Sequence, residues 1–152
     1  MRKLVKKIAV SILINFDTGI EEWQIKRFDE WMGVKEKIHY AENLPTIRDR
    51  QVWWCALGEN VGVEVNGKSG AFSRPILIFK KINRYSFLGV PLTSVPHYDK
   101  WHAQFTFQEK DSFAKLTQIR VLSTSRLYYY MGMVTKNDYD IVRRGLKRVY
   151  HL

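Results

Sequence analysis

Residues 75–107 read PILIFKKINRYSFLGVPLTSVPHYDKWHAQFTF, and this stretch decides the fold class. It contains three short apolar runs, at residues 75–79, 85–92 and 101–107. The last run alternates apolar and polar residues with the period of two that is typical of a half-buried strand. Asn83-Arg84 turns the chain between the first two runs, and Pro91 predicts a bulge or strand end in the second. No helical pattern separates the runs, so the strands are expected to pair antiparallel.

Further strand signals extend this pattern in both directions. Upstream, residues 52–57 form an apolar, aromatic run, and residues 114–122 form a downstream run with basic residues interspersed. Residues 58–73 hold four of the nine glycines, which predicts a long mobile loop, with a short hairpin around Asn66-Gly67. The sequence therefore predicts a mainly β chain with helices (α+β), built as a small antiparallel barrel or curled sheet.

One helix is expected before the strands in the chain and another after them. Apolar residues recur at helical spacing over residues 20–39, and Thr18 is expected to cap this helix with Glu21 as its capping-box partner. A second helix is expected after Thr135, with Asp138 three residues later in the partner position. Its opposite face is rich in arginine and lysine, which the helix dipole favours toward the C-terminal end.

Pro45 ends the first helical pattern and marks a linker at residues 41–49. We therefore expect an N-terminal helical extension at residues 1–49 and a barrel domain at residues 50–152. Residues 1–14 start with basic residues and continue with an apolar run. That run is too short to span a bilayer and lacks a small-x-small cleavage site, so a basic segment packed on the domain is expected.

The composition points to a polyanionic partner. The 152-residue chain has 25 lysines and arginines against 15 acidic residues, a formal net charge of +10. Such an excess is typical of proteins that meet nucleic acid or an anionic membrane surface. The single cysteine, Cys55, excludes a disulfide framework or a cysteine-rich zinc site within one chain, and it favours a reduced, cytoplasmic setting.

Metal and cofactor motifs are missing from the sequence. It holds no HExxH, P-loop, GxGxxG or Gly-x-Ser-x-Gly pattern, so no metal or cofactor is expected. His102 falls in the alternating run and is interpreted as a strand histidine rather than a base, and Cys55 as a buried apolar residue. None of the histidines has a partner at helical or zinc-type spacing; they are His39, His97, His102 and His151.

The residues able to do chemistry are basic or hydroxylic. Arg74 stands where the glycine-rich loop enters a strand, and Thr93-Ser94 ends the next strand. Lys115, Gln118 and Arg120 are expected to share a later strand. A guanidinium binds phosphate through two donors and stabilises the charge that develops on it, and a hydroxyl can hold a phosphate oxygen. This set suits phosphodiester cleavage without a metal, with the 2′-hydroxyl of RNA as the nucleophile.

RNA contacts are expected from cationic side chains and one aromatic ring. Lys100 and Trp101 lie next to each other after the Thr-Ser pair, as in proteins that stack single-stranded bases at roughly 1–3 kcal/mol per base. The alternative interpretation, which the sequence slightly favours, is that Trp101 starts a buried strand. The full set predicted to bind RNA is Lys68, Lys80, Lys81, Arg84, Lys100, Trp101, Lys115 and Gln118.

The order of these short motifs resembles the MazF/PemK toxin family. The motifs are Val52-Trp-Trp-Cys-Ala-Leu-Gly58, Gly62-Val-Glu64, Gly67-Lys68, Ser73-Arg-Pro-Ile-Leu-Ile-Phe79, Gly89-Val-Pro-Leu-Thr-Ser94 and Leu116-Thr-Gln-Ile-Arg-Val-Leu122, followed by Ser125-Arg-Leu127 and a terminal helix. They span about residues 50–150. The resemblance implies an SH3-like antiparallel barrel with a C-terminal helix, a homodimer, and a metal-independent endoribonuclease of type II toxin–antitoxin systems. It further implies cleavage of single-stranded RNA to a 2′,3′-cyclic phosphate and a 5′-hydroxyl, and inhibition by a cognate antitoxin.

The resemblance also implies roles for individual residues. Arg74 matches the family arginine that binds phosphate and stabilises the transition state. Thr93 and Ser94 match the hydroxyls that contact the scissile phosphate, and Arg120 matches the arginine of a strand Gln-x-Arg. The chain departs from the family pattern in four places: Val63 stands where some members have a histidine, Lys115 and Thr117 where some have an arginine and an aspartate, and Ser123 where many have an aspartate. A lysine in place of the arginine keeps the charge but loses the planar fork.

Two alternative functions fit the same barrel. One is a gyrase inhibitor of the CcdB type, which has no catalytic site. That family ends in Trp-Gly-Ile, whereas this chain ends in Tyr150-His-Leu152, which argues against it. The other is a nucleic-acid-binding barrel without catalysis, which the family positions changed in this chain support.

Overall fold

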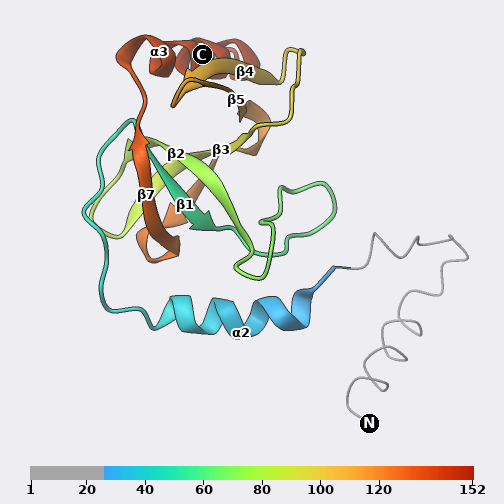
Figure 1. Ribbon diagram of the computed structural model, residues 1–152, viewed down its shortest axis with the longest axis vertical. Helices are drawn as coiled ribbons and strands as arrows, with labels where there is room; N and C mark the ends of the chain where they lie inside the picture. Colours follow the sequence, from blue (N-terminus) through green and yellow to red (C-terminus); the bar gives the residue numbers. More distant parts are fainter. Residues whose placement is uncertain (1–25) are drawn as a thin grey trace, which may run out of the picture.

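The computed structural model describes residues 26–152 (Figure 1). It is mainly antiparallel β-structure with a helix before and a helix after the strands, as the sequence predicts. The helices are α2 (Phe28–His39) and α3 (Lys136–Tyr150). The strands are β1 (Gln51–Ala56), β2 (Ser73–Lys81), β3 (Ser86–Thr93), β4 (His102–Phe107), β5 (Lys110–Lys115), β6 (Arg120–Ser123) and β7 (Leu127–Met133). Two single 3₁₀ turns, η2 (Leu116–Gln118) and η3 (Thr124–Arg126), connect the last three strands.

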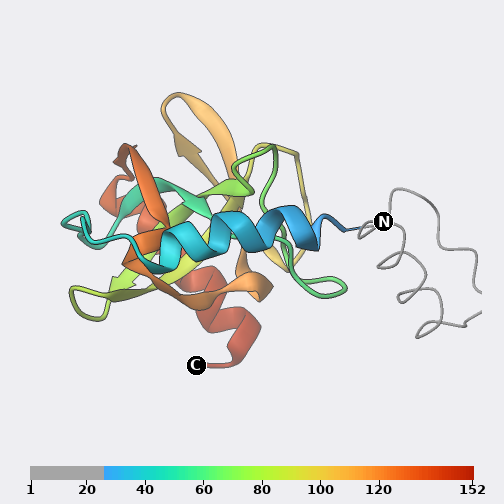
Figure 2. The same cartoon turned by 90° about the horizontal axis from the view of Figure 1, so that it is seen from below.

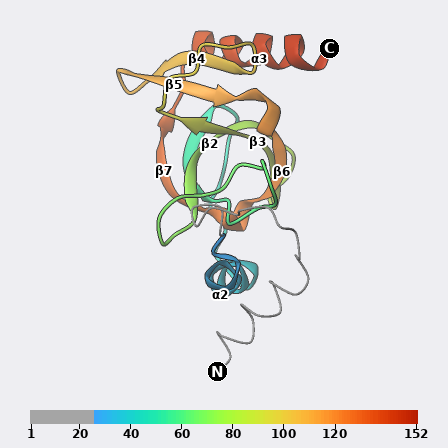
Figure 3. The ribbon, with the colours of Figure 1, turned by 90° about the vertical axis from the view of Figure 1, so that its right-hand side faces the viewer.

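The strands form one curled sheet in the order β4-β5-β3-β2-β1-β7, with β6 added on β3 (Figure 3). β3 changes neighbour along its length: Ser86–Gly89 pairs with β6, whereas Leu92 and Thr93 pair with β5. Pro91 lies in the gap between these two pairings, where its missing N–H costs no ladder hydrogen bond on that side. The sheet curls into a barrel that is not closed.

Two hydrophobic cores lie on opposite faces of β2 and β3. Ile76 and Ile78 point into the curled sheet with Cys55, Phe87 and Leu122. Leu77 points to the other face, toward the second core, which α3 covers with its apolar stripe. The members of that core include Val90, Leu92, Phe105, Val142 and Leu146. The alternation of side chains along a strand explains how one strand supplies both cores.

Cys55 is fully buried, as predicted from its aromatic surroundings. Burial raises the pKa of its thiol to about 12, so the thiolate is scarce at neutral pH. Helix α3 also begins as predicted: the Thr135 hydroxyl accepts a hydrogen bond from the Asp138 amide at 3.1 Å and donates one to the Asp138 carboxylate at 2.6 Å. These two bonds fix the start of the helix.

Two predicted elements are wrong in detail. The single strand expected over residues 114–122 is two strands, β5 and β6, separated by η2. The chain turns a corner between them, because β5 pairs with β4 and the end of β3, whereas β6 pairs with the start of β3. Leu116 is buried at this corner against Gly145 of α3. The hairpin expected around Asn66-Gly67 is also missing, since the turn falls at residues 69–72, closed by one bridge between Lys68 and Ser73.

The N-terminal helix is shorter within the described residues than the pattern predicted. α2 begins at Phe28, after Arg27, which provides no side-chain cap. The opening segment at residues 1–14, the predicted cap at Thr18 with Glu21, and the first part of the predicted helix lie outside the described residues. In the expected linker, Ile47 is buried in the core of the curled sheet, and Asp49 binds the Lys81 amide.

Helix α2 packs on the loop at residues 57–72, at the end of the molecule opposite α3 (Figures 1 and 2). Trp31 is buried against Ala56 and Phe72, with its ring 5.6 Å from that of Phe72. Gly58 has a φ of +88° and lies so close to the Trp31 indole that a β-carbon would overlap the ring. Glycine is therefore required at position 58 by both conformation and space.

The contact between Gly58 and Trp31 predicts a non-additive double mutant. Gly58→Ala should lower the free energy of unfolding by about 2–4 kcal/mol, because the methyl group meets the indole and the φ is unfavourable. Trp31→Ala should cost about 3–5 kcal/mol through lost packing. Trp31→Ala removes the ring that the new methyl group would meet. The free energy of unfolding of the double variant, measured in urea, should therefore exceed the value expected from adding the two single changes by at least about 1 kcal/mol.

Gly33→Ala is the matched control. A β-carbon at Gly33 on α2 meets nothing within 4 Å, so this change should be neutral or slightly stabilising. Additive effects of the Gly58 and Trp31 substitutions would contradict the packing described.

Candidate active site

The two principal predicted site residues lie just beyond the same end of the pairing between β2 and β3. Ile76 pairs with Pro91 at that end of the ladder, and Arg74 and Thr93 each lie two residues further along their strands. Because side chains alternate along a strand, Arg74 lies on the same face as Ile76, and Thr93 on the same face as Pro91. Thr93 is buried and its hydroxyl accepts a hydrogen bond from the Val95 amide at 3.2 Å. Ser94 is exposed.

Arg74 is half-buried at the end of the curled sheet, beneath the loop at residues 57–72. Its Nε donates to the Asn66 carbonyl at 3.0 Å, and among the described residues its two terminal nitrogens have no hydrogen-bond acceptor. Burial lowers the pKa of the guanidinium, which remains a cation at neutral pH. The arginine is thus fixed through one nitrogen and offers the others to an anion.

Lys115 adds a second cation at this place. It is the last residue of β5, and its neighbours include Arg74 and Lys68. Burial, followed by repulsion from Arg74 and from Lys68, lowers the pKa of Lys115, while Asp99 acts in the opposite direction. Electrostatic repulsion among three neighbouring cations costs free energy in the free protein, and a bound phosphate would relieve that repulsion.

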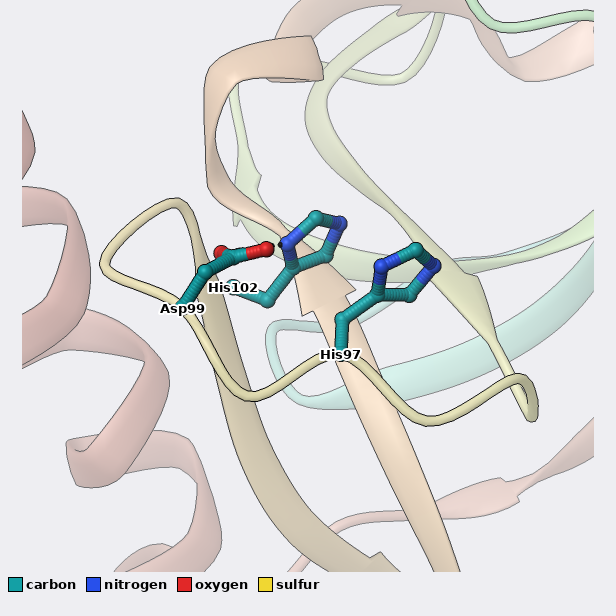
Figure 4. A group of neighbouring side chains, drawn as sticks. All are labelled: His97, Asp99 and His102. Atoms are coloured by element: carbon teal, nitrogen blue, oxygen red, sulfur yellow. Dashed lines mark hydrogen bonds and ion pairs between the residues drawn. The ribbon is translucent and has the colours of Figure 1, made fainter.

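A histidine cluster lies beside Lys115, and the sequence reasoning missed it (Figure 4). His102 Nδ1 is 2.8 Å from Asp99 Oδ1, and the His97 ring is stacked on the His102 ring with centroids 4.1 Å apart and planes at 8°. His102 also pairs with Lys115 across β4 and β5. Two observations were available in the sequence: the spacing His97-x-Asp-x-x-His102 and its place directly after Thr93-Ser94.

The electrostatics of this cluster follow from its geometry. The hydrogen bond to His102, and then the one from the Trp101 amide, lower the pKa of Asp99. Desolvation lowers the pKa of His97, and repulsion from His102 and Lys115 acts in the same direction. Asp99 acts on His97 in the opposite direction, but the Asp99 carboxylate makes its hydrogen bond to His102.

The same cluster is the group in residues 26–152 whose ligand atoms are close enough to share a cation, within 4.8 Å of one another. The geometry fits a metal poorly, because imidazole lone pairs lie in the ring planes and two nearly parallel planes do not converge on one ion. The neighbouring Lys115 and Arg74 would also repel a cation. The arrangement suits proton transfer better than metal binding.

Gln118 holds the loop over Arg74. The predicted strand position is wrong, since Gln118 lies in the turn η2. Its side-chain oxygen accepts a hydrogen bond from the Val65 amide at 2.9 Å, and its nitrogen donates to the Val63 carbonyl at 3.5 Å. The oxygen and the nitrogen of the side-chain amide are thus both hydrogen-bonded to the loop backbone. Val65, one of these partners, immediately precedes Asn66, whose carbonyl accepts the hydrogen bond from Arg74.

Lys100 and Trp101 lie in the segment that carries the histidines. The Lys100 ammonium is 4.4 Å from the centre of the Trp101 ring, and Trp101 is 43% exposed at the residue just before β4. Trp101 is therefore not the buried start of a strand. Its exposed face beside a cation is the arrangement that base stacking uses.

Three other predicted residues lie toward the end of β2 opposite Arg74. Lys80 and Lys81 are the last two residues of β2 and Arg84 follows it, and Lys80 lies about 20 Å along the strand from Arg74 at roughly 3.3 Å per residue. Lys80 forms an ion pair with Asp49 at 3.0 Å. Arg120 begins β6 rather than sharing a strand with Lys115, and it pairs with Gly89.

Arg126, which the sequence analysis did not select, is the cation next to Arg120. Burial lowers the pKa of Arg126, and repulsion from Arg120 adds to this. Its guanidinium donates to the Ala56 carbonyl at 2.8 Å, and it lies over the Trp31 ring with 5.7 Å between the guanidinium carbon and the ring centre. Arg126 thus links β1 to helix α2.

Comparison with models of known protein families shows which family the chain belongs to. The family model of the PemK-like, MazF-like toxins of type II toxin–antitoxin systems matches residues 48–150. The chain belongs to this family. A search of curated proteins found no match.

The solved structures that resemble this toxin-family chain carry the same fold. One is an endoribonuclease from a mycobacterial species in complex with its cognate antitoxin, at 20% identity and a TM-score of 0.55, covering 70% of this chain and 97% of that one. Another is MazF from Deinococcus radiodurans, at 15% identity and a TM-score of 0.59, covering 73% of this chain and 100% of that one. A MazE–MazF structure from the same organism matches at 13% identity and a TM-score of 0.54, covering 73% and 99%. At these identities the likeness shows the shared fold. None of the helices within residues 26–152 has the length and hydropathy needed to cross a bilayer.

The contacts of Gln118 predict a specific change in loop dynamics. Gln118→Ala removes the acceptor of the Val65 amide, so this amide should exchange its hydrogen at least about fivefold faster, as expected for losing a bond worth about 1 kcal/mol. Hydrogen–deuterium exchange measures this. Gln104→Ala, on the exposed face of β4, is the matched control and should leave Val65 unchanged. Unchanged exchange in the Gln118 variant would show that the side chain does not hold the loop.

Proposed function

We propose that the protein is the toxin of a type II toxin–antitoxin system and a metal-independent endoribonuclease. It cleaves single-stranded RNA, mRNA included, by attack of the 2′-hydroxyl on the adjacent phosphorus, and leaves a 2′,3′-cyclic phosphate and a 5′-hydroxyl. The observation that supports the proposal is that Arg74 and Thr93 lie just beyond the Ile76–Pro91 pair, at the same end of the β2–β3 ladder, and that Arg74 interacts electrostatically with Lys115. A cationic fork and a hydroxyl on one face are what a phosphodiester undergoing attack requires.

Arg74 and Thr93 have the central roles in this proposal. The free nitrogens of Arg74 bind the nonbridging oxygens of the scissile phosphate and stabilise the charge that grows on them. Thr93, with Ser94 next to it, contacts the same phosphate and orients the ribose. Arg120 contributes a further positive charge from the start of β6.

RNA reaches this site along two groups of side chains. Lys68, Lys115 and the exposed pair Lys100 and Trp101 lie on the side of Arg74, where phosphates and one base bind. Gln118 acts through the loop it holds. A second patch at the far end of β2 contacts RNA farther from the scissile bond; its members are Lys80, Lys81 and Arg84.

The family membership supports further proposals on partners and setting. The protein works in the cytoplasm as a homodimer and is inhibited by a cognate antitoxin. The exposed basic face of α3, formed by Arg143, Arg144 and Lys147, is a suitable contact for an acidic antitoxin segment. Residues 1–49 form an extension, and residues 50–152 carry the catalytic domain.

Substitution of Arg74 and Thr93 tests the proposed function. Arg74→Ala and Thr93→Val should each lower the rate of RNA cleavage about 10²–10³-fold or more, with growth arrest lost in cells that express the variant. Arg74→Lys keeps the charge without the two-point fork and should also be slow. The measurement is cleavage of a single-stranded RNA by the full chain in EDTA, with end-labelling to identify a 5′-hydroxyl.

Arg144→Ala on the exposed face of α3 is the control and should cleave at the normal rate. Thermal unfolding of each variant separates lost chemistry from lost structure. Normal cleavage by the Arg74 and Thr93 variants would refute this site. RNA binding without cleavage by the wild type would instead support a nucleic-acid-binding barrel, and growth arrest without RNA cleavage would support a gyrase inhibitor.

A further inference from the structure

We propose that His102 is the general base of the RNA cleavage reaction and that Asp99 and His97 are its positioning residues. This inference rests on the proposed ribonuclease function and supplies the proton-transfer group which that function needs. The family positions at which the resemblance led us to expect a histidine or an aspartate hold Val63, Thr117 and Ser123. The segment between β3 and β4 supplies an imidazole from a different place in the chain.

His102 is held on three sides. Its backbone is fixed by pairing with Lys115. Its Nδ1 is 2.8 Å from Asp99 Oδ1, and the same carboxylate oxygen accepts a hydrogen bond from the Trp101 amide at 2.8 Å. The His97 ring covers one face of the imidazole (Figure 4). A side chain fixed at one edge and one face keeps a single orientation, which a catalytic base needs.

The hydrogen bond to Asp99 determines which nitrogen can act. A carboxylate only accepts, so Nδ1 carries the hydrogen and Nε2 holds the lone pair. The His102 side chain is 14% exposed, which shelters the ring and still lets a ligand reach it. When Nε2 takes up a proton, the Asp99 carboxylate stabilises the imidazolium that forms.

Charged and titratable groups face His102 from two elements. Asp99 and His97 face it from the segment between β3 and β4, and Lys115 is its partner on β5. Arg74 and Lys68 in turn interact electrostatically with Lys115. The imidazole thus stands between a carboxylate and the cations that the proposed function assigns to the phosphate.

The reaction step balances with groups of this chain. His102 Nε2 takes the proton of the 2′-hydroxyl as the 2′-oxygen bonds to phosphorus. The bond from phosphorus to the 5′-oxygen breaks, and the Lys115 ammonium gives its proton to that oxygen. His102 then releases a proton to water and Lys115 takes one up. Burial and the nearby cations lower the pKa of Lys115, which eases its role as the acid.

The test is a pH–rate profile of the full chain on a single-stranded RNA. The wild type should lose activity toward acid pH as the base becomes protonated. His102→Gln should cleave about 10²–10⁴-fold more slowly and should lack this acid limb. Asp99→Asn should be slow and should have an altered acid limb, since it retains the size of the side chain without the charge. His39→Gln, on the exposed side of α2, is the matched control and should behave like the wild type.

Two further measurements separate catalysis from structure. His97→Phe keeps the stacked ring and should retain most activity, whereas His97→Ala should lose several-fold. Each variant should bind a 2′-deoxy analogue of the RNA as tightly as the wild type does, which a misfolded protein would not.

The outcomes distinguish this inference from the proposed function. If His102→Gln cleaves RNA at a rate within about threefold of the wild type and still loses activity toward acid pH, the proposed role of His102 is overturned. The proposed ribonuclease function would be unaffected by that result. His102→Gln that loses both cleavage and binding would also overturn the role of His102, because the residue would then be structural. A wild type that cleaves no RNA at any pH would overturn both.

Discussion

The antiparallel register between β2 and β3 is the constraint on which the candidate site depends. It is fixed by two cores at once, because Ile76 and Ile78 must face the inside of the curled sheet while Leu77 faces the layer under α3. A slip by one residue would exchange these faces along the whole strand. The same constraint fixes which face of the sheet Arg74 and Thr93 occupy, two residues beyond the Ile76–Pro91 pair, so the stability of the fold and the geometry of the candidate site have one origin.

The two residues just before α2, Lys26 and Arg27, contact the loop at residues 57–72 that covers Arg74. Lys26 donates to the Asn60 carbonyl at 2.5 Å, to the Gly62 carbonyl at 3.0 Å and to the Asn66 side chain at 3.4 Å. Arg27 donates to the Ser69 carbonyl at 2.7 Å. The carbonyl of Asn66 accepts from Arg74, so one loop residue contacts both the extension and the proposed catalytic arginine. The glycines give the loop freedom, and these contacts restrict it.

Much of the fold was predictable from the sequence, because its signals are local. Apolar runs bounded by turn residues, and alternation in the last of them, identified the strands over residues 75–107, and Thr135 with Asp138 identified the start of α3. The corner at η2 was not predictable, because it follows from the change of strand partner and from the space that Gly145 leaves for Leu116. The residues of the candidate site were likewise predictable only in part. Short motifs pointed to Arg74 and Thr93, and the spacing of His97, Asp99 and His102 was visible in the sequence, but the stacking of the two rings depends on how the chain folds back between β3 and β4. For Lys80, Lys81 and Arg84, a count of charges does not reveal that they lie toward the other end of β2.

The convergence of Arg74 and Thr93 on one phosphate is tested most directly by a crystal structure with RNA. The RNA should carry a 2′-deoxyribose at the scissile position, so that it binds without being cleaved. The terminal nitrogens of Arg74 should bind the scissile phosphate, which should lie against Thr93, with the histidine segment beside the ribose. An RNA that occupies only the patch of Lys80, Lys81 and Arg84, with Arg74 still covered by its loop, would contradict this convergence.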